Sequence, residues 1–221
     1  MKKLLSFKVV ILGEDGVGKT NICLRVADNL IEKSRYSIGA NFFTYEREIN
    51  EELITLKIRD YYIPQRFISV LGKLLRGAQG GILVFDLTNP ESLAKIPFWL
   101  NILINASGFI PIILIGNKND LKSERRISTK AVSTLTHLLD IPFFETSGLT
   151  GENIEVALYH LISMIRSPLD LDTENPQINP WILTTHTYCP YCGTQILIQY
   201  EQEKTSAFCL NCANLVYTHE K

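Results

Sequence analysis

The chain has 221 residues, of which 46% are hydrophobic and 20% are charged, and its formal net charge is −1. A chain of this length allows one domain of about 165 residues plus a small second unit. A net charge so close to zero gives no support for a protein that binds nucleic acid or a membrane surface as a whole. No apolar run reaches the roughly 18 residues that a membrane-spanning helix needs.

The hydrophobic pattern predicts alternating strands and helices along residues 1–167. Strands are expected at 7–12, 41–49, 53–59, 81–86, 111–116 and 142–145, and the second and third of these form a hairpin. Helices are expected near 19–30, 65–76, 91–105, 128–139 and 152–166. This alternation indicates an α/β fold, in which helices cover a mostly parallel sheet.

A glycine-rich loop follows the first expected strand and reads Gly-Glu-Asp-Gly-Val-Gly-Lys-Thr at 13–20. Its spacing is that of the phosphate-binding P-loop, G-x-x-x-x-G-K-[ST]. The glycines allow a tight turn whose backbone N–H groups point at phosphate oxygens, and the helix that begins here adds its positive end. Lys19 is expected to reach the outer phosphates and the Thr20 hydroxyl to bind Mg²⁺. The predicted nucleotide-binding residues of this loop are Gly13, Asp15, Gly16, Val17, Gly18, Lys19, Thr20 and Asn21.

Two further polar segments follow buried strands about a hundred residues on. The first is Asn-Lys-Asn-Asp at 117–120, which in isolation is also compatible with a capped turn. An Asp here can accept two N–H bonds from guanine, whereas adenine offers the opposite pattern and would leave the carboxylate unpaired. The second segment is Thr-Ser-Gly at 146–148, three small polar residues that follow the strand expected at 142–145 and whose backbone could contact the base. The residues expected at the base are Asn117, Lys118, Asp120, Ser147 and Gly148.

These motifs, in this order and at these separations, resemble those of a small GTPase of the Ras superfamily. The segment Phe-Asp-Leu-Thr-Asn-Pro-Glu-Ser-Leu at 85–93 is similar to the Rab branch, and Ser37-Ile38-Gly39 stands where Rab proteins have Thr-Ile-Gly. The resemblance covers roughly residues 5–166. It implies a P-loop GTPase fold, a six-stranded and mostly parallel sheet flanked by helices, with GTP or GDP at the carboxyl ends of the strands.

The resemblance also implies a magnesium site and protein partners. The Mg²⁺ ligands would be Thr20, Ser37 and Asp60, with the last acting through water. Effector or regulatory proteins would be the partners of such a switch. Tyr61 and Tyr62 follow Asp60, and we expect one of them to be buried and the other exposed.

The sequence departs from the family after Asp60. The family motif Asp-Thr-Ala-Gly-Gln contains a Gly that senses the γ-phosphate and a Gln that orients the attacking water, but here Ile63 and Pro64 replace them. Gln65 is displaced by one residue and is either a substitute for the glutamine or simply the start of a helix. We therefore expect slow or partner-assisted GTP hydrolysis. The alternative is a hydrolysis-deficient, nucleotide-bound scaffold.

The C-terminal part carries two Cys pairs, Cys189 and Cys192, then Cys209 and Cys212, in the pattern C-x₂-C-x₁₆-C-x₂-C. Two such pairs can form a tetrahedral thiolate site for Zn²⁺. The alternating run at 194–200 between them predicts a strand, as in a zinc ribbon. Two disulfides are the alternative, which the absence of a signal peptide disfavours. The fifth cysteine, Cys23, is expected in the core.

The expected organisation is a Ras/Rab-like GTPase domain at 1–167, a Pro-rich acidic linker at 168–187 and a zinc ribbon at 188–218. The final residues include no cysteine for prenylation, so no lipid anchor is expected. The ribbon has few basic residues, and binding of nucleic acid is not expected. The sequence thus predicts a cytoplasmic guanine-nucleotide-binding regulatory protein.

Overall fold

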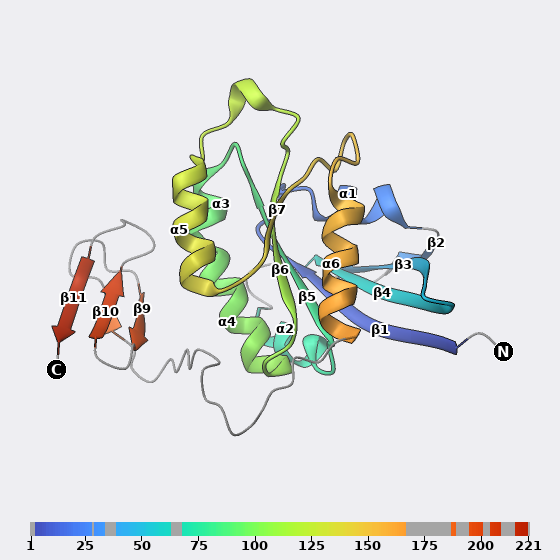
Figure 1. The fold of residues 1–221 in the computed structure, drawn as a ribbon, viewed down its shortest axis with the longest axis horizontal. Coiled ribbons are helices and arrows are strands. Elements are labelled where there is room, and N and C mark those ends of the chain that lie inside the picture. Colours follow the sequence, from blue (N-terminus) through green and yellow to red (C-terminus); the bar gives the residue numbers. More distant parts are fainter. Residues whose placement is uncertain are drawn as a thin grey trace. The chain divides into compact units, whose positions relative to one another are not determined.

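A computed structural model describes residues 3–27, 29–33, 39–62, 68–166, 187–188, 195–200, 204–208 and 215–220. Contacts within the chain divide it into two units, Met1–Ser167 and Pro168–Lys221. Each unit is built on its own β-sheet, of seven strands in the first and four in the second. Figure 1 shows the elements of both units.

The first unit is centred on a sheet in the order β2-β3-β4-β1-β5-β6-β7. β1 pairs in parallel with β4 and β5, and β6 pairs in parallel with β5 and β7, whereas β3 runs antiparallel to β4 and β2. All six expected strands and the expected hairpin are therefore present. The strands are β1 (Lys3–Leu12), β2 (Asn29–Lys33), β3 (Gly39–Ile49), β4 (Glu52–Tyr62), β5 (Gly80–Asp86), β6 (Ile112–Asn117) and β7 (Phe143–Glu145).

The prediction of a helix near 19–30 is wrong in its second half. The helix α1 spans Lys19–Val26 and ends at Ala27, whose backbone is extended at φ −68° and ψ 127°. Residues Asn29–Lys33 form β2, which pairs with β3 from Asn29–Thr44 to Lys33–Asn41 and extends the sheet beyond the six expected strands. The periodicity of a short apolar run does not distinguish a strand from a helix. In this segment the pairing with β3 determines that residues 29–33 form a strand.

Helices cover both faces of this sheet (Figure 1), with α1 and α6 on one face and α2 to α5 on the other. The helix expected near 91–105 is divided in two at Lys95. Asn89 and Ser128 cap α3 and α5 by accepting the backbone N–H of Glu91 and Ala131. The helices beyond α1 are α2 (Ile68–Leu75), α3 (Pro90–Ala94), α4 (Ile96–Ser107), α5 (Thr129–Leu139) and α6 (Ile154–Arg166).

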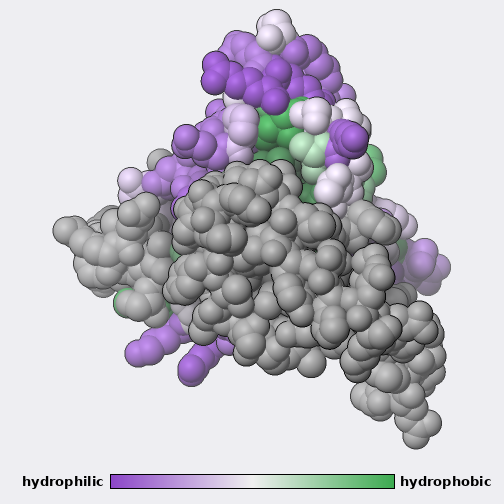
Figure 2. Space-filling view, turned by 90° about the vertical axis from the view of Figure 1, so that its left-hand side faces the viewer, coloured by the Kyte–Doolittle hydropathy of each residue, from purple (hydrophilic) through white to green (hydrophobic). Residues whose placement is uncertain are grey.

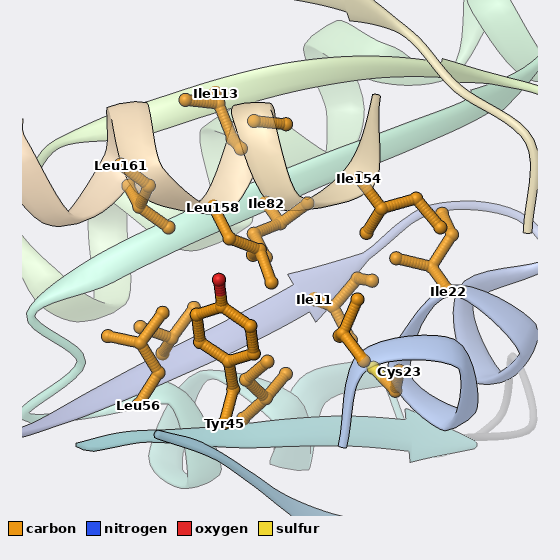
Figure 3. Close-up of a cluster of buried hydrophobic side chains, with 14 of the residues drawn as sticks. Ile11, Ile22, Cys23, Tyr45, Leu56, Ile82, Ile113, Ile154, Leu158 and Leu161 are labelled. Carbon is orange, nitrogen blue, oxygen red and sulfur yellow. The ribbon is translucent and has the colours of Figure 1, made fainter. Parts of the chain in front are cut away.

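The buried core on the α1 and α6 face is shown in Figure 3. Ile11, Ile82 and Ile113 project from three neighbouring strands towards Leu158 of α6, because alternate residues of a strand face the same side. Cys23 of α1 is 1% exposed in this cluster, and burial raises the pKa of its thiol well above the ordinary value. Its expected place in the core is confirmed.

The second unit contains an antiparallel sheet in the order β11-β10-β9-β8. Its strands are β8 (Thr187–Tyr188), β9 (Gln195–Tyr200), β10 (Lys204–Phe208) and β11 (Leu215–Glu220). The alternating run expected to be a strand is therefore one. The four paired cysteines lie outside the described residues, as do most of the linker expected at 168–187 and the residues Ser37, Ile63, Pro64 and Gln65.

The described part of the chain has a hydrophilic end, and its helices fall short of what crossing a membrane requires. Hydrophilic residues gather at the top of Figure 2, the end of the first unit where the short 3₁₀ helix η2 (Lys122–Glu124) lies in Figure 1. Among the described helices, none combines the length and apolarity that crossing a membrane requires.

Candidate functional site

The predicted site residues that the structure describes lie near the carboxyl ends of β4 and β6, in the segments that follow β1, β6 and β7, and on the first turn of α1. Together with β5, these strands run parallel to one another, so their carboxyl ends meet at one edge of the sheet. In open α/β sheets this edge is where ligands bind. The sheet therefore brings together motifs that are about a hundred residues apart.

The backbone of the loop after β1 requires glycine at two positions. Gly13 and Gly18 have φ values of 150° and 92°, which side chains rarely allow. A Cβ on Gly13 would lie 2.2 Å from the carbonyl oxygen of Val84, and one on Gly18 would lie 2.3 Å from Nδ2 of Asn117. The loop is thus packed against the ends of β5 and β6, and its shape depends on the missing side chains.

Lys19 lies against the inside of this loop. Its Nζ donates to the carbonyl oxygens of Gly13 and Glu14, each at 2.8 Å. Burial lowers the pKa of Lys19, and the nearby carboxylates of Asp60, Asp15 and Glu14 offset part of this effect. A partly desolvated ammonium beside the loop amides is well placed to bind an anion, because the low polarity of its surroundings strengthens the attraction.

Thr20 and Asp60 form the candidate magnesium site. Oγ1 of Thr20 donates to Oδ2 of Asp60 at 2.6 Å, and Asp60 is only 4% exposed. Mg²⁺ prefers oxygen ligands and usually combines one or two protein groups with waters and phosphates. Because Thr20 donates its proton to Asp60, its oxygen lone pairs remain acceptors, and the donor set fits Mg²⁺.

Asn117 connects the phosphate loop with the loop after β7. Its Nδ2 donates to the carbonyl oxygen of Val17 at 2.8 Å. Its Oδ1 accepts the backbone N–H of Gly148 at 2.9 Å and the hydroxyl of Thr146 at 3.3 Å. The predicted residue is therefore in the site, where it holds two loops in a fixed relation.

The acidic residue expected to read the base is held by Ser147. The Ser147 hydroxyl donates to Oδ1 of Asp120 at 2.5 Å and itself accepts the backbone N–H of Thr150 at 3.0 Å. A Cβ on Gly148 would lie 3.2 Å from Cβ of Asn21, so the loop after β7 packs on the first turn of α1. Asp120, Ser147, Gly148 and Asn21 are thus brought together, as predicted for one ligand.

Lys118 is held by a residue that the sequence reasoning missed. Its Nζ lies 2.7 Å from Oδ2 of Asp86, whose Oδ1 accepts the Thr88 N–H at 2.8 Å and the Thr88 hydroxyl at 2.7 Å. Burial raises the pKa of Asp86, but the hydrogen bonds from Lys118 and Thr88 outweigh it, and the net pKa lies below the ordinary value. Asp86 is the last residue of the apolar strand β5, as Asn117 is of β6. This shared position at a strand end could have indicated from the sequence that Asp86 belongs to the site.

A second missed contact joins the phosphate loop to α4. Nε1 of Trp99 donates to Oε1 of Glu14 at 3.0 Å, although the two residues are 85 positions apart. A cavity beside them is lined by Leu12, Gly13, Asp15, Lys19, Tyr61, Leu71 and Trp99. No sequence pattern predicts this pair, because it depends on how α4 packs against the loop.

Tyr61 and Tyr62 differ in burial, as expected. Tyr61 is 7% exposed and its hydroxyl donates to the carbonyl oxygen of Leu74 in α2 at 3.1 Å, whereas Tyr62 is 62% exposed. Asp15, placed by the sequence among the nucleotide-binding residues of the loop, is exposed and is one of the residues that line the cavity.

Comparison with known proteins matches residues 8–167 to the model of the Ras family. The Ras-related protein Rab-11C of Dictyostelium discoideum is 35% identical over 178 residues, which cover 76% of this chain and 80% of the relative. The Ras-related protein RABA4b of Arabidopsis thaliana is 34% identical over 212 residues, covering 92% and 91%. The Ras-related protein Rab-25 of Bos taurus is 34% identical over 171 residues, covering 76% and 80%.

The last element of the site is an ion pair at the start of the loop after β7. Nη1 and Nη2 of Arg125 donate to Oε2 and Oε1 of Glu145 at 2.7 and 2.5 Å. The Arg125 hydrogen bonds lower the pKa of Glu145, and burial opposes them only in part. Since Glu145 directly precedes Thr146 and Ser147, this pair holds the loop against the segment after η2.

We predict a pH-dependent loss of stability for Glu145→Gln. A carboxyl whose pKa is lowered in the folded state stabilises it above its unfolded pKa of about 4.3, and this contribution is lost as the pH falls through the lower folded value. The variant should be less stable by about 1 kcal/mol at pH 7, since the pair is partly solvent-screened. Urea denaturation at pH 7 and below pH 4 measures the difference, which should shrink in acid.

The matched control is Glu155→Gln. Glu155 pairs with Arg47 at 2.5 Å, but its side chain is 62% exposed, so its removal should change stability by less than about 0.5 kcal/mol. A Glu145→Gln effect that is equally large at pH 7 and pH 3 would show that packing, and not charge, is lost.

Proposed function

Since this chain belongs to the Ras family and is a Rab-like GTP-binding regulatory switch, we propose that it selects guanine nucleotides through Asp120 and hydrolyses GTP slowly or with a partner's help. The observation that carries the proposal is the Asn117 side chain, which joins the loop for phosphates to the loop for the base. Effector or regulatory proteins would read the nucleotide state, as for other members of the family.

Each part of the site has a distinct task in this proposal. The loop amides and Lys19 bind the phosphates, and Asp120 accepts the N–H groups of guanine. Thr20 and Asp60 would hold Mg²⁺, which neutralises phosphate charge and orients the outer phosphates when it is bound. Lys118, held by Asp86 at 2.7 Å, lies two residues before Asp120 along the chain and would flank the base.

Base selection is tested by titrating the protein with GDP and ADP. We predict that ADP binds at least about 100-fold more weakly, because a buried carboxylate facing the wrong hydrogen-bond pattern costs roughly 3 kcal/mol or more. Asp120→Asn should shift preference from guanine towards xanthine nucleotides, since an amide presents a donor where the carboxylate presents an acceptor. Calorimetry or displacement of a fluorescent nucleotide measures both.

The control for base selection is Asp140→Asn. Asp140 is exposed and ends α5 with a φ of 49°, a conformation that Asn also tolerates. Its replacement should leave base preference unchanged. Equal affinities of the unmodified protein for GDP and ADP would contradict the proposed role of Asp120.

Slow hydrolysis is proposed from the residues after Asp60. Pro64 has no side-chain donor and no backbone N–H, so it cannot orient water as the family glutamine does. Tyr61 and Tyr62 belong to β4 and pair with Ala40 and Gly39 of β3. This pairing holds the backbone of β4 as far as Tyr62, directly before the Ile63 and Pro64 that replace the family's glycine and glutamine.

We predict intrinsic hydrolysis on the order of 10⁻⁴ s⁻¹ or slower, the range of unassisted Ras. Pro64→Gln should restore little, because Ile63 still replaces the glycine, and Gln65→Ala should leave the rate unchanged unless Gln65 substitutes for the glutamine. Single-turnover hydrolysis of bound GTP measures the rate. A rate above about 10⁻² s⁻¹ would contradict the proposal. No detectable hydrolysis would favour the alternative, a nucleotide-bound scaffold.

We further propose that the second unit is a zinc ribbon, separated by a linker at 168–187. Tyr188, where β8 ends, pairs with Gln195, where β9 begins. Phe208, where β10 ends, pairs with Leu197 of β9 and with Leu215, where β11 begins. The β8–β9 and β10–β11 connections therefore leave the sheet at the same end. The two Cys pairs belong to these connections, which supports a shared Cys₄ zinc site.

Metal analysis of the full chain tests the ribbon. We predict one Zn²⁺ per chain, lost when Cys209→Ser and Cys212→Ser are combined, because a structural zinc site needs four ligands. Cys23→Ala is the matched control and should retain the zinc, since Cys23 is buried in the core of the first unit. Protein that contains no zinc but two disulfides, found by mass spectrometry, would replace this proposal.

A further inference from the structure

The phosphate loop carries two acidic side chains, Glu14 and Asp15, next to the place proposed for a polyphosphate. A negative charge in this position repels phosphate oxygens unless its side chain is held away from them. Asp15 is exposed. Glu14 is partly buried and its carboxylate accepts the indole N–H of Trp99 at 3.0 Å. Trp99 thus holds one carboxylate oxygen of Glu14.

Trp99 reaches the loop from the first turn of α4. Its indole stands edge-on to Phe98, with ring centroids 5.3 Å apart and an interplanar angle of 76°. It lines the same cavity as Lys19, Tyr61 of β4 and Leu71 of α2. The ring therefore lines this cavity, and its N–H is presented to Glu14 from a helix.

The Glu14 end of the loop is the end that faces the outer phosphates. The lysine of a P-loop reaches the β- and γ-phosphates. Here Nζ of Lys19 lies 2.8 Å from the carbonyl oxygens of both Gly13 and Glu14. Displacement of Glu14 would therefore disturb the binding of a triphosphate more than that of a diphosphate, because the triphosphate places more negative charge at this end.

We propose that Trp99 is a positioning residue for the phosphate loop, whose indole N–H holds the Glu14 carboxylate away from the phosphates and so favours GTP relative to GDP. The proposal rests on the guanine-nucleotide binding proposed above. It assigns a nucleotide-selective role to a residue that lies on α4, outside the phosphate and base motifs.

The test is Trp99→Phe in the full chain, with GDP and a non-hydrolysable GTP analogue as probes. Phenylalanine keeps an aromatic ring in the cavity and removes only the N–H donor. A hydrogen bond to a charged group is strong enough that its loss should weaken binding of the GTP analogue about 10-fold. Binding of GDP should weaken by no more than about 3-fold, and both effects should grow at low ionic strength.

A second variant separates positioning from packing. Glu14→Gln removes the charge but keeps an acceptor for the indole, so Trp99→Phe should cost little GTP-analogue affinity in this background. A purely packing role predicts the same loss in both backgrounds, since the two changes would then be additive. Phe109→Leu, just beyond the end of α4 and 72% exposed, is the control and should change neither affinity.

Three results would overturn the inference: equal losses for the two nucleotides, the same loss with and without the Glu14 charge, or no loss at all in Trp99→Phe. Failure of the proposed function looks different, because the unmodified protein would then bind neither GDP nor the GTP analogue.

Discussion

The buried amide of Asn117 is the contact on which the geometry of the site depends. It needs both halves of its side chain, because Nδ2 donates to Val17 while Oδ1 accepts from Gly148. A carboxylate in its place would lack the donor, and leaving the buried carbonyl of Val17 without a partner costs about 1–3 kcal/mol. The close contact between the Asn117 side chain and the phosphate loop also requires glycine at position 18, since a Cβ there would lie 2.3 Å from Nδ2 of Asn117. Two motifs a hundred residues apart are therefore coupled by one hydrogen bond and one steric limit.

The parallel sheet makes this coupling possible, and it also buries the polar side chains at the carboxyl ends of its central strands. Every residue of β5 and β6 is buried, including Asp86 and Asn117 at their carboxyl ends. A buried charge needs a partner, and Asp86 has Lys118 at 2.7 Å and two hydrogen bonds from Thr88. The polar groups at this edge thus satisfy one another, and each fixes a neighbour that is proposed to touch the nucleotide.

Local patterns predicted the strands, the phosphate loop and the base motif because each has a short sequence signature that the fold does not alter. One of Tyr61 and Tyr62 was expected to be buried, and the alternation of side chains along β4, which continues past the expected strand, explains why Tyr61 and Tyr62 differ. The edge strand β2 escaped prediction, since pairing with β3 decides its conformation. Two side-chain contacts were also not predicted, Trp99–Glu14 and Arg125–Glu145. The packing of a helix and the course of a loop bring these partners together, and neither produces a periodic pattern in the sequence.

The C-terminal end of α2 is held by side chains from other elements of the first unit. Carbonyl groups at its C-terminal end accept bonds from three elements, with Lys8 Nζ and the Tyr61 hydroxyl donating to Leu74 at 3.0 and 3.1 Å and Ser107 donating to Leu75 at 2.9 Å. Side chains that satisfy helix-terminal carbonyls stabilise that end of the helix. Tyr62 is held on the other side by pairing with Gly39. The last turn of α2 and the end of β4 are therefore both tied to the rest of the first unit.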